Sequence, residues 1–444
     1  MHRYFPHTPH DIKLMLEKCG VDKLDDLYAD VPQELRLKHP YNLPEEMSEM
    51  QVRRFFDNLG ADNEQLICFA GAGYYDHYTP AVIPQMIERG EFLTAYTPYQ
   101  PEISQGTLHY IFEYQSMMAN LTGMDVSNAS MYDGTTATAE AMLMAVAHAR
   151  KRNTVLISST VAPAVRKVCA TYARYHGVDL VEIPATDNGV TDRAFVESRL
   201  EANDVAGVIV ATPNFYGILE DYTGWADMCH QHKTLLIFHA VASDLACIKT
   251  PGEWGADIAA GDAQSLGMPL SYGGPYLGFL CCTKALIRKL PGRIVGATTD
   301  ANGKRVFVLT LQAREQHIRR DKATSNICSN QGLMSLFTAM YLSVTGPDGL
   351  REIGMEGYNG AHYLANKLIE TGKFAMTYPD SEFFNEFCLT ATSINLDEFM
   401  DLCVASGILP GVKIDSDKLL VAVTETRTRA EMDLLAVSYT HLRA

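Results

Sequence analysis

The stretch from Ala206 to His239 reads AGVIVATPNFYGILEDYTGWADMCHQHKTLLIFH, and it decides the fold class. One apolar run ends at Thr212, a helical segment follows at 222–232, and a second apolar run begins at Thr234. Strands that are apolar at every position are typical of parallel sheets that helices cover on both faces. The stretch therefore predicts an α/β unit in which a right-handed helical crossover joins two parallel strands.

The same alternation of apolar runs and helical segments continues on both sides, from about residue 108 to about residue 285. It predicts one mostly parallel central sheet with helices on both faces. Beyond the two runs above, strands are expected at 154–159, 179–183, 257–261 and 276–282, and helices at 108–122, 137–151, 161–175 and 192–202. A further helix is expected at 284–290.

Three segments follow from these patterns. Residues 1–62 are short helical pieces broken by prolines and are expected to form an N-terminal helical arm. Residues 63–345 are expected to form a large α/β domain, and residues 346–444 a small C-terminal α+β domain. The last eight residues, 437–444, do not continue an amphipathic helix, and no function is assigned to them.

Composition excludes several classes of protein. The 444 residues include 37 Lys and Arg against 53 Asp and Glu, a net charge of −16, which argues against a nucleic-acid or anionic-membrane partner. No apolar stretch is long enough to span a bilayer, and no apolar leader begins the chain. None of the 10 cysteines forms a Cys-x-x-Cys pair, and His230 and His232 point in different directions on a helix, so no metal site is expected. These features favour a cytoplasmic protein.

Three motifs could carry chemistry. Asp133, Gly134, Thr135 and Thr136 open a helix, where free amides and the helix dipole either bind an anion or form an ordinary cap. Gly, Pro and Tyr are dense in the loop 92–106, a composition typical of a defined functional loop or of a structural one. Residues 314–322, with four basic and two acidic side chains, are either a solvated or interface cluster or an anion clamp.

The sequence of the loop 96–106, YTPYQPEISQG, resembles that of a known protein family. The chain resembles the first (α) subunit of the two-subunit glycine decarboxylases, the P-protein family of the glycine cleavage system. The resemblance implies the fold of type I pyridoxal-phosphate (PLP) transferases, similar to aspartate aminotransferase. The stretches that carry it are 69–80, 92–115, 121–140, 255–279 and 311–330.

The resemblance also implies a reaction and its partners. PLP acts as the electron sink while glycine loses CO2, and the aminomethyl group passes to the lipoyl group of the H-protein. Type I enzymes carry a PLP lysine after the strand at 257–261, but Ser265 stands there, and no lysine occurs between Lys249 and Lys284. The strand before it also lacks the expected aspartate. We therefore expect PLP in the homologous β subunit, not in this chain, and an α2β2 assembly.

Roles for several residues follow from the resemblance alone. Side chains of the 96–106 loop are expected to reach the glycine or lipoyl end of the β-subunit site, and Asp133–Thr136 is expected to be a relic of a phosphate cup. No catalytic residue is expected in this chain. The expected loop residues are Tyr96, Thr97, Tyr99, Gln100 and Glu102, and the expected interface residues are Gly273, Gly274, Arg314, Arg319, Arg320 and Lys322.

Two alternatives stay open at this point. One is a self-sufficient PLP enzyme for a small amino acid, with Lys284 or Lys322 as an unusual PLP lysine. The other is a non-catalytic scaffold that docks the lipoyl carrier.

Overall fold

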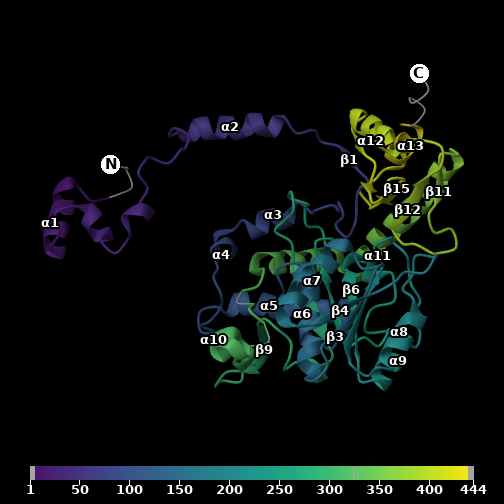
Figure 1. The fold of residues 1–444 in the computed structure, drawn as a ribbon, viewed down its shortest axis with the longest axis horizontal. Coiled ribbons are helices and arrows are strands. Elements are labelled where there is room, and N and C mark those ends of the chain that lie inside the picture. The colour runs from purple at the N-terminus through teal and green to yellow at the C-terminus, as the bar shows by residue number, and fades with distance from the viewer. Residues whose placement is uncertain (1–5, 324, 328, 439–444) are drawn as a thin grey trace. The chain divides into compact units, whose positions relative to one another are not determined.

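The computed structural model describes residues 6–323, 325–327 and 329–438 of the chain (Figure 1). It divides into two compact units, Met1–Glu64 and Gln65–Ala444. The predicted tail at 437–444 lies outside the described residues except for its first two positions. Among the described residues, no helix is long and apolar enough to cross a membrane.

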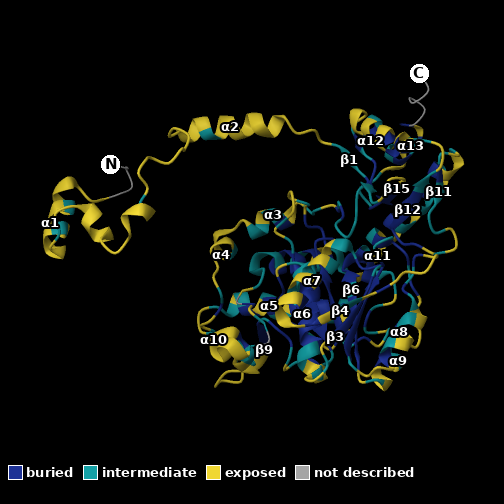
Figure 2. Cartoon of the chain, viewed as in Figure 1, coloured by how far each residue is buried: buried dark blue, intermediate teal, exposed yellow. Residues whose placement is uncertain are grey.

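The first unit consists of helices α1 (Pro9–Cys19) and α2 (Glu49–Ala61) with short turns between them. Both helices begin with a capping box, which satisfies the free amides of the first turn (Thr8 with Asp11, Ser48 with Gln51). None of its described residues is buried (Figure 2).

The second unit is built on a seven-stranded sheet of order β2-β8-β7-β6-β5-β3-β4. The strands from β7 to β4 run parallel, as the sequence predicts, whereas β8 pairs antiparallel with β7 and with β2. The strands are β2 (Val126–Ser127), β3 (Thr154–Ser158), β4 (Asp179–Ile183), β5 (Val205–Thr212), β6 (Leu235–Val241), β7 (Ile258–Asp262) and β8 (Gly278–Cys282).

Helices cover both faces of this sheet (Figure 1). Alternate residues of β5 enter the two hydrophobic cores: Val208 and Val210 pack on one side, Ile209 and Ala211 on the other. Helices α6 (Gly134–Ala149) and α7 (Pro163–His176) form one layer. The other layer contains α5 (Gln105–Thr122), α8 (Arg193–Leu200), α9 (Trp225–Gln231) and the first part of α11 (Gly332–Glu370).

Helix α11 continues past the predicted domain boundary at 345/346. Its backbone breaks at Gly346, where φ is 61° and ψ is −179°, and Pro347 follows. A four-stranded antiparallel sheet of order β11-β12-β15-β14 lies beyond the break and packs on α11. Its strands are β11 (Phe374–Met376), β12 (Glu386–Ala391), β14 (Val412–Lys413) and β15 (Lys418–Ala422), and its helices are α12 (Leu396–Ala405) and α13 (Arg429–Val437).

After β8 the structure differs from the sequence prediction at one helix and adds one hairpin that the sequence did not predict. Residues 284–290 were expected to be a helix, but only a 3-10 turn forms at Lys284–Leu286. The following polar stretch contains a hairpin of β9 (Ile294–Thr299) and β10 (Arg305–Thr310), which packs against α5. The remaining elements are short: α3 (Val82–Ile87), α4 (Gly90–Leu93), α10 (Gln316–Arg319), β1 (Ile67–Cys68) and β13 (Ile408–Leu409).

Candidate functional site

The N-terminus of α6 is closed by two carboxylates of the chain itself. Asp133 is the N-cap, and its Oδ1 accepts a hydrogen bond from the amide of Thr136 at 2.9 Å. The amide of Gly134 donates to Oδ2 of Asp262 at 2.8 Å. Free amides at a helix N-terminus attract anions. Here two of these amides already donate to carboxyl groups of the chain. Asp133–Thr136 is therefore better described as an ordinary helix cap than as a site that is open to an external anion.

Asp262 reaches α6 because it is the last residue of β7, next to the helix in the layered fold. Burial raises its pKa to about 7, although hydrogen bonds from the amides of Gly134 and Gln264 act in the opposite direction. A Cβ on Gly134 would lie 2.6 Å from the backbone nitrogen of Asp262, so this close approach requires glycine. A phosphate at this helix terminus would have to displace Asp262 and approach Asp133.

Gln264 and Ser265, the second and third residues after β7, are buried and hydrogen-bonded. The hydroxyl of Ser265, 1% exposed, accepts a hydrogen bond from the amide of Ser243 at 3.1 Å. The side-chain amide of Gln264 binds both backbone groups of Tyr75, its Oε1 accepting at 2.9 Å and its Nε2 donating at 2.8 Å. Gln264 thereby fixes the Gly- and Tyr-rich segment 69–80 against the end of β7.

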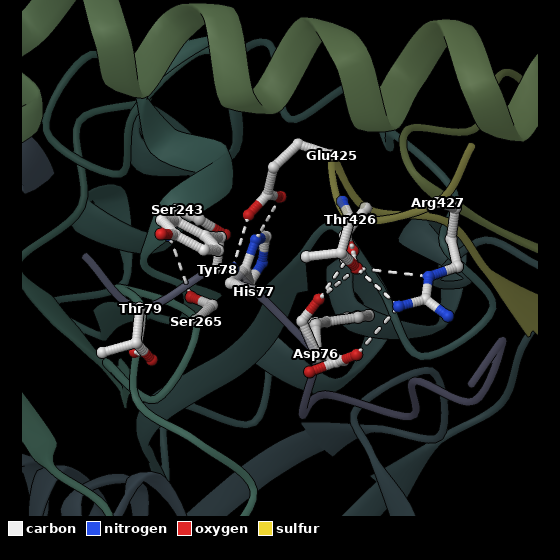
Figure 3. A network of polar contacts seen from close by, with 12 residues as sticks. Asp76, His77, Tyr78, Thr79, Ser243, Ser265, Glu425, Thr426 and Arg427 are labelled. Atoms are coloured by element: carbon white, nitrogen blue, oxygen red, sulfur yellow. Dashed lines mark hydrogen bonds and ion pairs between the residues drawn. The ribbon is translucent and has the colours of Figure 1, made fainter. Parts of the chain in front are cut away.

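The same segment is bonded to the turn after β15 (Figure 3). His77 Nδ1 lies 2.7 Å from Oε2 of Glu425, and the amide of Tyr78 donates to the other oxygen at 2.8 Å. Arg427 pairs with Asp76 at 3.1 Å. Burial alone would raise the pKa of Glu425, but the hydrogen bond and charge of His77 outweigh it and hold that pKa below its usual value. These contacts join residues nearly 350 positions apart.

Two buried polar atoms beside Ser265 have no hydrogen-bond partner among the described residues: Nε2 of His77 and Oδ2 of Asp244. Burial raises the pKa of Asp244 to about 6. Unsatisfied buried groups of this kind are rare in folded proteins and cluster at functional or solvated sites. The cluster around Ser265 is therefore the best candidate functional centre of the described chain.

The loop residues predicted from the resemblance lie at the surface. Tyr96 is 80% exposed and Tyr99 51%, while Thr97 is half-buried. The Tyr99 hydroxyl accepts a hydrogen bond from Arg293 at 3.2 Å, and its ring lies 5.4 Å from that guanidinium. Gln100 and Glu102 are exposed. Their role towards another subunit stays a prediction.

The residues predicted at an interface fall into two groups. Gly273 and Gly274, with φ of 112° and 130°, form an exposed turn beside Tyr272, which is 99% exposed. Arg314 instead donates to three backbone carbonyls, those of Leu290, Gly292 and Leu311. The remaining predicted side chains are fully available at the surface: Arg319, Arg320 and Lys322. Their interface role stays a prediction.

Sequence reasoning missed Asp262, His77 and Glu425. Asp262 offered a usable signal, because an acid at the end of an otherwise apolar strand needs a partner. The His77–Glu425 pair gave no signal in the sequence, since no local pattern links two positions so far apart. Among the described residues, no group of three or more His, Cys, Asp and Glu side chains could hold a metal ion.

Comparison with known proteins gives one consistent result. A family model described as glycine cleavage system P-protein matches residues 2–438. A relative from Moorella thermoacetica, "Probable glycine dehydrogenase (decarboxylating) subunit 1", is 45% identical over 98% of both chains. A relative of the same description from Carboxydothermus hydrogenoformans is 46% identical, also over 98% of both chains.

Solved structures agree with the sequence relatives. A crystal structure of glycine decarboxylase (P-protein), in inhibitor-bound form, matches with a TM-score of 0.90 and 40% identity, covering 99% of this chain and 100% of that one. A Lactobacillus brevis glutamate decarboxylase matches at a TM-score of 0.70 but only 14% identity, over 93% and 97% of the chains. The second likeness shows the fold alone, that of type I PLP enzymes, as the sequence predicts.

Proposed function

Since the chain belongs to the P-protein family of the glycine cleavage system, as subunit 1 of a two-subunit glycine dehydrogenase (decarboxylating), we propose that it is the subunit that does not carry PLP. The family and the fold are PLP-dependent. The proposal assigns the cofactor to the homologous second subunit. In this proposal the chain supports the second subunit and contributes side chains to the active site of that subunit.

The observation that carries the proposal is the pair of carboxylates at the start of α6. PLP enzymes of this fold need a phosphate site and a lysine for the cofactor. Here Asp262 and Asp133 take the helix amides that a phosphate would use. Ser265, at the position of the lysine, has no amine and is hydrogen-bonded within the fold. The residues present do not fit PLP.

Two further contacts support the same conclusion. His239, on the strand where an aspartate would face the cofactor ring, pairs through Nδ1 with the hydroxyl of Thr138 at 2.8 Å. Burial lowers the pKa of His239 to about 4, so its ring is neutral. Neither Lys284 nor Lys322 supports the alternative of a self-sufficient PLP enzyme. Lys284 follows β8 in a surface turn, and Lys322 is exposed.

The proposed partners follow from the family reaction. Glycine binds at the site of the second subunit, and the lipoylated H-protein receives the aminomethyl group. We propose that Tyr96, Thr97, Tyr99, Gln100 and Glu102 complete that site from this chain, which agrees with the exposure of this loop. An α2β2 assembly in the cytoplasm is part of the proposal.

Glycine–bicarbonate exchange tests the proposal. The purified chain is expected to show no exchange and no borohydride-reducible PLP absorption, and exchange is expected when the homologous second subunit is added. Exchange or covalent PLP in the chain alone would overturn the assignment of the cofactor.

A second experiment tests the loop. Tyr96→Ala and Gln100→Ala variants in the assembled enzyme are expected to lower exchange at least tenfold without loss of assembly. Asp401→Ala, an exposed change on α12, is the matched control. Unchanged exchange in both loop variants would remove the site-completing role.

A further inference from the structure

A cavity lies between α6, α7 and the segment 325–327. Its volume is about 260 Å³, and its lining includes none of the residues of the site described above. Three tyrosines, Tyr132, Tyr172 and Tyr175, line it together with His176 and Glu140. A cavity of this size holds a small organic molecule rather than a single water.

Glu140 is an unusual residue at the wall of this cavity. It belongs to α6, where its neighbours Ala139 and Ala141 are fully buried, and it is itself only 4% exposed. Burial raises the pKa of its carboxyl to about 7, although a hydrogen bond from Ser325 acts in the opposite direction. Ser325 gives this carboxyl a hydroxyl partner, but a buried glutamate is usually paired with a charged group, because a carboxylate loses hydration there.

Aromatic side chains of α7 form another part of the cavity wall. The rings of Tyr172 and His176 stack with centroids 6.4 Å apart, and Tyr175 lies at the mouth, 76% exposed. Arg174 already lies over the outer ring, 5.6 Å from the centroid of Tyr175. Tyrosine faces attract cations, most strongly where water is excluded.

Two carboxylates place negative charge near the Tyr172 ring. Burial, and then the negative charges of Glu140 and Asp133, raise the pKa of Tyr172. The other titratable groups that line the cavity are Tyr132, before α6, and Tyr175 and His176, on α7, and the cationic Arg174 lies over the outer face at Tyr175. His176 is exposed, whereas Glu140 is buried at the wall, so the acidic group of the cavity is the one shielded from water.

We propose that this cavity binds a primary alkylammonium group, with the ammonium on the Glu140 carboxylate and the attached hydrocarbon between the tyrosine rings. The cation compensates the buried carboxylate, and the apolar stem packs on Tyr172 and Leu143. The ammonium belongs either to a free small amine or to a lysine side chain of the assembled partner subunit.

Binding of benzylamine to the purified full chain tests the proposal. It is measured by NMR titration at about pH 8, where the amine keeps its proton. Benzyl alcohol is the neutral molecule of the same shape.

For a ligand of this size we expect a dissociation constant of about 1–10 mM. We expect benzyl alcohol and the Glu140→Gln variant to bind at least tenfold more weakly. Glu201→Gln, an exposed change, is the matched control.

Two further arms complete the test. Tyr172→Leu is expected to weaken benzylamine severalfold, whereas Tyr172→Phe keeps the ring and the affinity. Competition between benzylamine and the second subunit would assign the ammonium to a partner lysine, and absence of competition to a free amine. Equal binding of benzyl alcohol, or unchanged binding in correctly folded Glu140→Gln, would overturn the proposal. All arms except the competition use the chain alone, so they do not depend on the assignment of PLP.

Discussion

Asp262, the last residue of β7, accepts a hydrogen bond at 2.8 Å from the amide of Gly134 in the first turn of α6. A helix terminus that would attract an external anion is thereby satisfied from within the chain. Burial raises the pKa of the same carboxyl to about 7, so desolvation of Asp262 offsets part of the stabilisation that its hydrogen bond provides.

Removal of this carboxylate should reopen the anion site. In Asp262→Ala, we expect inorganic phosphate to raise the melting temperature by about 1 °C or more, roughly 1 kcal/mol of binding, relative to chloride of equal ionic strength. The wild-type chain and the exposed-surface control Asp401→Ala should not respond. Equal stabilisation of the wild type by phosphate would show that the carboxylates do not close the site.

Restoring the lysine alone should not restore the cofactor. In Ser265→Lys, the start of α6 remains capped by Asp133 and Asp262, so we expect no borohydride-stable PLP adduct by mass spectrometry. The buried position makes some loss of stability certain, and far-UV circular dichroism identifies folded protein. An adduct in the folded single variant would mean that the lysine was the one missing part.

Glu386 should make the stability depend on pH. Its carboxyl accepts hydrogen bonds from the amide of Ala72 at 2.6 Å and the hydroxyl of Tyr75 at 2.8 Å. Burial raises its pKa from 4.5 to about 7. Between these values the folded state keeps a proton that the unfolded chain has lost, so the free energy of unfolding falls as pH rises from about 4.5 to about 7.

The Glu386→Gln variant measures this contribution. Glutamine keeps an acceptor for Ala72, and the Tyr75 hydroxyl can turn to accept, while the titration disappears. Relative to wild type, the variant should gain about 3 kcal/mol between pH 5 and pH 8, from urea unfolding at both values. Other raised carboxyls titrate in both proteins and cancel. A difference independent of pH would contradict the assignment.

Gly71 is required by its neighbours. A Cβ there would lie 2.3 Å from Oε1 of Glu386 and 2.7 Å from Cβ of Ala422. We therefore expect Gly71→Ala to lower the free energy of unfolding by about 2 kcal/mol or more. Gly106, in α5, has no atom within 4 Å of its added Cβ, so Gly106→Ala should be neutral or stabilising. Similar losses in both variants would indicate a backbone effect instead of a packing clash.

The elements that the sequence predicted well have a strong local pattern. The apolar runs at β3, β5 and β6 and the helix at α7 lie within a residue or two of their expected positions. The hairpin β9–β10 was missed because its strands, with residues such as Arg305 and Thr298, lack a continuous apolar run. The two antiparallel strands β2 and β8 also gave no directional signal, since strand direction depends on the connection and not on composition.

The sequence by itself determined the parallel sheet, the family and the absence of a lysine at Ser265, because periodicity and residue identity are local properties. Only the tertiary structure decided which groups close the N-terminus of α6 and hold Ser265. The partners Asp262 and Gly134 are 128 positions apart, and His77 and Glu425 are 348 apart. Such pairs meet because strand order and helix packing bring chain segments together, and no local pattern encodes that distance. The closed helix terminus is thus a property of the folded chain.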